Sequence, residues 1–134
     1  MTQEEKMLLI KDLSARLPYA VTVEHTSGFR GTLYNITVHH MYDDNDNIHD
    51  AICYTDFFGD EDSIYIEYFK PYLFPLSSMT EEQKKEQEAH FTCIKHDMSF
   101  SIYRYMEWCY KNHLDVNGLI PKGLAIDATG LNIY

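Results

Sequence analysis

The stretch VHHMYDDNDNIHD, which begins at Val38, gathers three histidines, four aspartates and two asparagines, the side chains that bind metal ions. A calcium-binding EF-hand loop needs oxygen ligands at alternate positions, a glycine at the sixth position and a glutamate at the twelfth. Two oxygen-bearing residues of a frame that starts at Asp43 are spaced correctly, Asn45 and Asn47. However, the sixth position is Ile48 and the twelfth is Tyr54, so the turn residue and the closing carboxylate are both missing.

A transition-metal site in the same stretch would use His39 or His40 together with His49 and an aspartate. Adjacent residues of a strand point to opposite faces, so only one of the two neighbouring histidines could contribute. Aspartate and asparagine are also the residues that ordinary turns use, because they bond to their own backbone. We therefore interpret this stretch as a solvated hairpin loop.

A second group of ligand-type residues lies further along the chain, where His90, Cys93 and Asp97 share one face of a predicted helix. His96 lies further round that helix, and His113 could join the group only if the helix folded back. Structural zinc sites need four ligands with paired spacings, and the sequence holds no CxxC or HExxH pattern. We therefore favour the flank of an ordinary helix over a zinc site.

The sequence contains no recognisable catalytic motif either. The three cysteines, Cys53, Cys93 and Cys109, lie among apolar or aromatic residues without a local nucleophile signature, and no GxSxG or glycine-rich phosphate loop is present. The acidic run at 60–62 reads as a turn, where carboxylates are solvated. The sequence thus predicts no catalytic, cofactor-binding or metal-binding residue. A Cys/His enzyme would need a pocket that joins Cys93 or Cys109 to one of the histidines at positions 90, 96 and 113.

Charge and composition narrow the partner classes. The net charge is −10, from 11 basic and 21 acidic residues, so a nucleic-acid role is disfavoured. The charge would suit a basic partner or the mimicry of an acidic ligand. No apolar run is long enough to cross a bilayer, and the N-terminus MTQEEKMLLIKDL lacks the layout of a secretion signal. The odd cysteine count fits a reducing compartment. We expect a cytoplasmic protein without a membrane span.

Tyrosine is unusually frequent, with 11 residues. Strand propensity accounts for most of those expected on the sheet, but tyrosine is also favoured at protein interfaces. A cluster left exposed on one face would be the best candidate for a binding surface. The residues in question are Tyr34, Tyr54, Tyr65 and Tyr68 on predicted strands, and Tyr103, Tyr105 and Tyr110 on a predicted helix.

The elements that must position these residues begin with a helix over 3–16, with a Thr2–Glu5 capping box before it and Pro18 after it. Alternating apolar residues then predict four strands joined as a meander, with a bulge near Asn35. The predicted strands cover 19–25, 29–40, 50–58 and 63–69. We expect a small antiparallel four-stranded sheet, which could curl into an SH3-like barrel.

The second half changes to helical spacing. A capping box from Thr80 to Gln83 starts a helix, and one apolar arc runs from Phe91 to Cys109. This predicts one long helix over 81–112 or two helices nearly in line, with a break near Asp97 left open. The apolar tail after it should pack onto the body. The expected fold is α+β in a single domain, with helix and sheet over 1–76 and the helical segment and packed tail over 77–134.

Three stretches resemble a family of small uncharacterised proteins of gut Bacteroides-type bacteria and their phages: KDLSARLPYAV (11–21), KPYLFPLSSMTEEQKKE (70–86) and NGLIPKGLAIDATGLNIY (117–134). Together they cover about a third of the chain, and the middle one is the most specific. The resemblance implies a bacterial or mobile-element origin. It implies no activity, and no residue receives a catalytic or binding role from it.

These observations favour a non-catalytic protein-interaction or accessory protein, which binds a protein partner or a second copy of itself through the sheet or the long helix. Two alternatives remain open: a small nucleic-acid-associated SH3-like module, and a Cys/His enzyme or metal-binding protein. The first depends on a closed barrel, and the second on a pocket that brings thiol and imidazole together.

Overall fold

The computed structural model describes residues 1–42, 48–55, 62–96 and 98–134. Helix α1 spans Gln3–Arg16, as predicted. The Thr2 hydroxyl accepts a hydrogen bond from the Glu5 backbone amide, and the Glu5 carboxylate accepts one from the Thr2 amide. The helix is followed by a 3-10 turn, η1 (Leu17–Tyr19), because proline fits such a turn but not a continuing helix.

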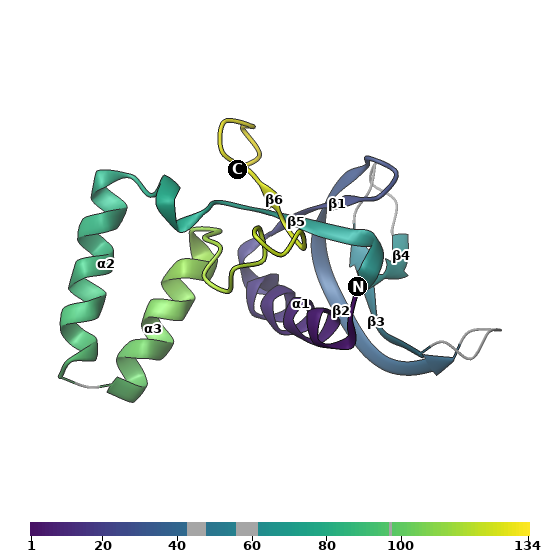
Figure 1. Cartoon of the computed structure of the whole chain (residues 1–134), viewed down its shortest axis with the longest axis horizontal. Coiled ribbons are helices and arrows are strands. Elements are labelled where there is room, and N and C mark those ends of the chain that lie inside the picture. Colours follow the sequence, from purple (N-terminus) through teal and green to yellow (C-terminus); the bar gives the residue numbers. More distant parts are fainter. Residues whose placement is uncertain (43–47, 56–61, 97) are drawn as a thin grey trace.

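The sheet follows α1, and its strands are arranged in the order β4-β3-β2-β1-β5-β6 (Figure 1). The predicted α+β class is confirmed. The sheet itself is mixed and open, with α1 against one side (Figure 1). The strands are β1 (Thr22–His25), β2 (Arg30–Tyr42), β3 (Ile48–Thr55), β4 (Asp62–Tyr65), β5 (Phe69–Leu73) and β6 (Ile126–Asp127).

The long strand β2 contains the bulge that the sequence predicts. Its pairing with β3 shifts register between Leu33 and Asn35, and shifts again between Val38 and Met41. An extra residue restores the inward direction of the apolar side chains on the far side of such a shift. The irregular alternation of apolar and polar residues near Asn35 therefore corresponds to a bulge in the strand.

The segment predicted as one strand over 63–69 is divided in the structure. β4 pairs with β3, a 3-10 turn η3 (Ile66–Tyr68) follows, and β5 pairs with β1. The barrel that the sequence left open does not form, because no ladder of the described strands joins the two edges of the sheet. The free edge of β5 is occupied by β6 from the tail, so it is not available to β4.

The prediction of a purely antiparallel sheet is also wrong. β6 runs parallel to β5, with Tyr72 opposite Ile126 and Leu73 opposite Asp127. Parallel neighbours need a long crossover connection, because the chain must return to the end at which the first strand began. The whole helical part of the second half forms this crossover.

The helical segment consists of two helices, α2 (Glu81–Ile94) and α3 (Met98–Lys111), after a 3-10 turn η4 (Leu76–Ser78). They lie side by side and run in opposite directions (Figure 1). The prediction of one long helix, or two nearly in line, is therefore wrong, although the break does fall where it was left open. The Thr80–Gln83 capping box of α2 is present as predicted.

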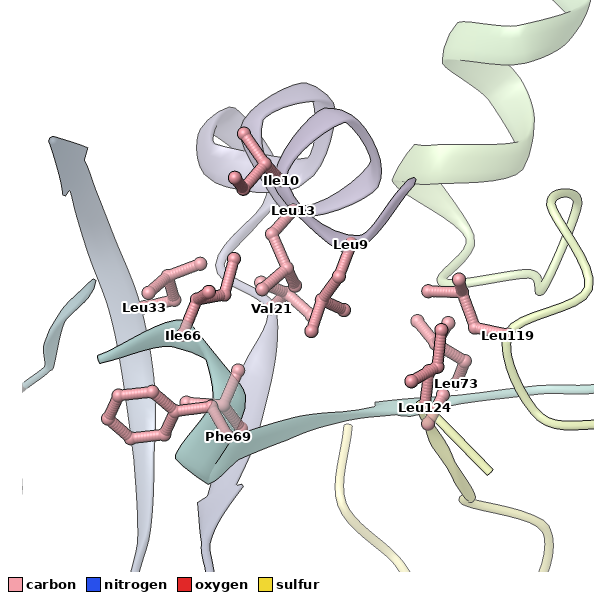
Figure 2. Close-up of a cluster of buried hydrophobic side chains, with 12 residues drawn as sticks. Leu9, Ile10, Leu13, Val21, Leu33, Ile66, Phe69, Leu73, Leu119 and Leu124 are labelled. Atoms are coloured by element: carbon pink, nitrogen blue, oxygen red, sulfur yellow. The ribbon is translucent and has the colours of Figure 1, made fainter. Parts of the chain in front are cut away.

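The hydrophobic core lies between α1, the inner strands and the tail (Figure 2). The helix contributes the stripe predicted from its spacing, and η3 with β5 closes the other side. The buried members are Leu9, Ile10, Leu13, Val21, Val23, Leu33, Ile66, Phe69, Leu73, Leu119, Leu124 and Ala125. The three tail residues show that the tail packs into the same core as the N-terminal helix.

A buried ion pair lies beside this core. Asp12 and Arg16 are both 0% exposed, and an Arg16 Nη2 atom donates to Asp12 Oδ2 at 3.0 Å and to the Leu114 carbonyl at 2.8 Å. The Asn117 side chain donates to Asp12 at 2.8 Å. The Arg16 guanidinium also lies over the Tyr110 ring, 5.0 Å from its centre. This network joins α1 to the end of α3 and to the tail.

None of the helices in the described part of the chain is long and apolar enough to cross a membrane.

Removing one member of the buried pair should destabilise the fold strongly, because the remaining charge would be buried without a partner. We expect Asp12→Ala to lower the free energy of unfolding by about 3–5 kcal/mol. Lys84→Ala breaks an exposed pair with Glu81 and should cost less than about 0.5 kcal/mol. Urea denaturation measures both, and equal losses for the two variants would contradict this role for Asp12.

Candidate functional site

Three helices lie next to one another, with α3 between α2 and α1, and the α2–α3 hairpin projects away from the sheet (Figure 1). The exposed surface of α3 is therefore flanked by two grooves. One lies between α3 and the end of α1 with η1, and the other follows the seam between α3 and α2. We call the two grooves and the strip of α3 between them the α3 face.

The tyrosine groove, between η1 and α3, has a volume of about 470 Å³. Its lining combines three aromatic rings with a thioether and one carboxylate: Tyr19, Tyr103, Met106, Glu107 and Tyr110. Ser14 and Ala15 of α1 form the opposite wall, and their small side chains leave it open. Tyr103 is 62% exposed, the highest value among the large hydrophobic side chains described as exposed.

Glu107 and Tyr19 are paired within this groove. The Tyr19 hydroxyl donates to Glu107 Oε1 at 3.4 Å. Desolvation, together with the adjacent Glu107 carboxylate, raises the pKa of Tyr19, so its hydroxyl keeps its proton. In the described part of the chain, Glu107 pairs with no lysine or arginine within salt-bridge distance. The groove thus combines neutral aromatic rings with one negative charge.

The seam groove, of about 400 Å³, follows the line between α2 and α3 and is lined by Glu86, His90, Trp108 and Lys111. Trp108 is the only tryptophan of the chain. Its indole Nε1 donates to Glu86 Oε2 at 2.7 Å, and its ring lies 5.5 Å from the His90 ring. These contacts hold α2 against α3 and leave Trp108 partly exposed in the groove.

The two grooves meet across α3, where Arg104 and Lys111 lie between Glu107 and Trp108 along one pocket. The α3 face is therefore divided by charge. Among the described residues, Glu107 is the one charged residue that lines the tyrosine groove. The seam groove and the pocket beside it carry Arg104, Lys111 and the His90 imidazole, together with the Glu86 carboxylate that accepts the Trp108 hydrogen bond.

The residues of the second ligand group are partly brought together. His90 and Cys93 line an extension of the seam groove, of about 220 Å³, together with Arg104. No hydrogen bond among the described residues joins His90 to Cys93. His96 is exposed at the end of α2, and Asp97 lies outside the described residues. Cys109 is buried, and burial raises the pKa of its thiol.

Most of the polar loop in the stretch that begins at Val38, the first candidate for a metal site, lies outside the described residues. Residues 43–47 lie outside the described residues, as do 56–61, which include most of the acidic turn. His39 and His40 fall on β2 and His49 on β3, where His49 is paired with Met41, but their side chains are not among those described. Among the described residues, no three His, Cys, Asp or Glu side chains form a group that could hold a metal ion.

The tyrosines divide by location. Tyr34 and Tyr68 are exposed on separate parts of the sheet region, at 45% and 44%. By contrast, Tyr103 and Tyr110 share one groove with Tyr19, a residue that the sequence analysis did not single out. Because Tyr19 precedes the sheet and Tyr103 lies on α3, no local pattern could have paired them.

His113 lies just beyond α3 and away from Cys93, and it adopts a left-handed backbone conformation with φ of 56°. Its ring stacks on Tyr134, with 3.6 Å between ring centres, and its Nδ1 atom is buried without a hydrogen-bond partner among the described residues. Burial, reinforced by the nearby Arg16 charge, lowers the pKa of His113 to about 4. His113 is thus a neutral packing residue that shapes the end of α3.

A scan against models of known protein families and searches of curated proteins and of solved structures find no match to this chain.

The lowered pKa of His113 predicts a pH dependence of stability. Between pH 6.5 and about 4 the unfolded chain binds a proton at this residue and the folded chain does not, so stability falls as the pH falls through that range and levels off below it. We expect a loss on the order of 2 kcal/mol, less than the whole pKa shift would give, because part of the ring meets solvent.

The control variant is His113→Asn, because asparagine tolerates a left-handed backbone and does not titrate. Urea unfolding of both proteins between pH 4 and 7 gives the difference in their stabilities, in which other titrating groups cancel. The wild-type chain should lose stability relative to the variant on acidification. A difference that does not change with pH would exclude His113 as the titrating group.

Proposed function

We propose that this chain is a non-catalytic protein-interaction or accessory protein of bacterial or phage origin, and that it binds a partner protein through the α3 face. The observation that carries the proposal is the composition of this face. Tryptophan, tyrosine and arginine are the residues that contribute most to binding energy at protein interfaces, and here they gather in two neighbouring grooves. The origin rests only on the resemblance of the three sequence stretches.

The arrangement of α2 supports the same proposal. This 14-residue helix has no buried residue, and its main packing partner among the described elements is α3. A helix that covers no core contributes little to the stability of its own chain. Phe91 on α2 and Ile102 on α3 are nevertheless exposed, at 39% and 43%. A partner on the hairpin would bury apolar surface that the described part of this chain leaves in water.

The alternatives have less support. The nucleic-acid hypothesis depended on an SH3-like barrel, but the sheet is open and the net charge of −10 opposes a polyanion. The enzyme hypothesis has a shared groove for His90 and Cys93, but the His90 ring packs against the Tyr105 and Trp108 rings. A general base must reach the proton that it removes, and this imidazole is held by aromatic neighbours instead.

Photocrosslinking tests the proposed interface. A photoreactive benzoylphenylalanine at position 103, within the α3 face, should give a defined protein adduct in extracts of a Bacteroides-type bacterium. The matched control carries the same group at position 88, which is exposed on the opposite side of α2. Adduct formation at position 103 should require Trp108, and Trp108→Ala should weaken binding by at least about 2 kcal/mol, or roughly 30-fold.

Light scattering of the purified chain completes the experiment, because a second copy of the chain is one of the partners considered. An adduct of twice the chain mass, with a dimer in solution, would identify self-association. Equal adducts from positions 103 and 88 would contradict the proposed interface. So would a monomer that forms no adduct from position 103 under any condition.

A further inference from the structure

The tyrosine groove has a chemical preference that goes beyond a general interface. Three tyrosines, Tyr19, Tyr103 and Tyr110, line this groove together with the Glu107 carboxylate. The faces of aromatic rings carry partial negative charge and attract cations within about 6 Å of the ring centre. A carboxylate among such rings adds a full negative charge at the same place. The natural occupant of this space is the cationic end of a side chain.

The same chain already uses this pairing twice. The Arg16 guanidinium lies 5.0 Å from the centre of the Tyr110 ring, and that of Arg30 lies 5.0 Å from the centre of the Tyr72 ring. Arg16 is fully buried, is paired with Asp12 and is not part of the groove lining. A cation from outside therefore meets the rings and Glu107 without a compensating charge on that side.

The groove also suits the stem of a long basic side chain. Lysine and arginine bury their aliphatic carbons along apolar surface while the charged end keeps polar contacts. Ala15 and Pro18 on one wall and Met106 on the other provide such surface, within a volume of about 470 Å³. The Glu107 carboxylate lies along the same groove and can accept a hydrogen bond from the charged end.

The charge distribution directs a basic side chain to this groove rather than to its neighbour. Arg104 and Lys111 line the adjoining pocket towards Trp108, where they offset the carboxylates of Glu107 and Glu86. By contrast, no lysine or arginine in the described part of the chain lines the tyrosine groove. At long range the net charge of −10 attracts basic segments to the molecule as a whole. Local and overall charge therefore favour the same class of ligand, and local charge selects the position.

We propose that the tyrosine groove binds a lysine or arginine side chain from a basic segment of the partner protein, held between Tyr19, Tyr103 and Tyr110 and paired with Glu107. This inference deepens the proposed function and rests on it for the identity of the ligand as a protein segment. It also assigns separate tasks to the two grooves. The tyrosine groove selects charge, and Trp108 in the seam groove contributes apolar contact.

An NMR titration tests the assignment with a defined probe, the peptide acetyl-Ala-Lys-Ala-Arg-Ala-amide, added to ¹⁵N-labelled protein at low salt. The comparison peptide has glutamine in place of both basic residues. We expect the basic peptide to shift the amide signals of Tyr19, Tyr103 and Glu107, and the neutral peptide to leave them in place. Fluorescence of Trp108, the only tryptophan, should change little, because the cation avoids the seam groove.

Matched variants separate the site from general attraction. Glu107→Gln and Glu88→Gln change the net charge equally, but only the first removes a charge from the groove. Glu107→Gln should weaken peptide binding at least about fivefold, and Glu88→Gln less than about twofold. Tyr103→Ala should also weaken binding about fivefold, while Tyr103→Phe should retain it, because a phenyl ring still attracts a cation.

Several results would overturn the assignment: equal shifts with the neutral peptide, equal losses for Glu107→Gln and Glu88→Gln, or shifts centred on Trp108. The crosslinking experiment distinguishes this failure from that of the proposed function. If position 103 forms its Trp108-dependent adduct but the peptide does not bind, only the charge selectivity is wrong. If the peptide binds at Glu107 but no adduct forms, the cation site stands and the proposed partner binding fails.

Discussion

A charged pair inside the protein, Asp12 with Arg16, determines where the second half of the chain is attached. Neither side chain reaches water, so their polar atoms can find partners only within the protein, and all but Nη1 of Arg16 do so among the described residues. The partners come from the segment after α3, through the Leu114 carbonyl and the Asn117 amide. The end of α3 is thereby held against α1, and the tyrosine groove is the space that remains between the two helices and η1.

The helical hairpin is best understood as a connection. It joins β5 to its parallel neighbour β6, and such a connection must leave the sheet and return to it. The core is already filled by α1 and by the tail residues, including Leu119 and Leu124. The hairpin therefore contributes little to the core, and its polar first turns face water. The hairpin mainly adds exposed surface to the molecule, and aromatic residues of α3 line the grooves on that surface.

Sequence patterns predict the structure correctly where the interactions that cause them are local. The Thr2 and Thr80 capping boxes and the bulge at Asn35 follow from hydrogen bonds and side-chain direction within a few residues. The reversal of direction between α2 and α3 could not be predicted from such patterns. An apolar arc indicates which side of a helix is buried, but it does not indicate which segment packs against that side. Arg16 did leave a signal, since it falls within the apolar stripe of α1, seven residues after Leu9. A charge at such a position indicates a buried partner.

The sequence by itself determined the class of fold, the ends of the first helix, the start of the second, and an acidic net charge. These depend on composition and on short-range spacing, which are present in the linear chain. Only the tertiary structure decided the parallel sixth strand, the direction of α3 and the meeting of Tyr19 with Tyr103 and Glu107. Those features depend on contacts between residues far apart in sequence, and such contacts exist only once burial of the core and of the Asp12–Arg16 pair has brought the segments together.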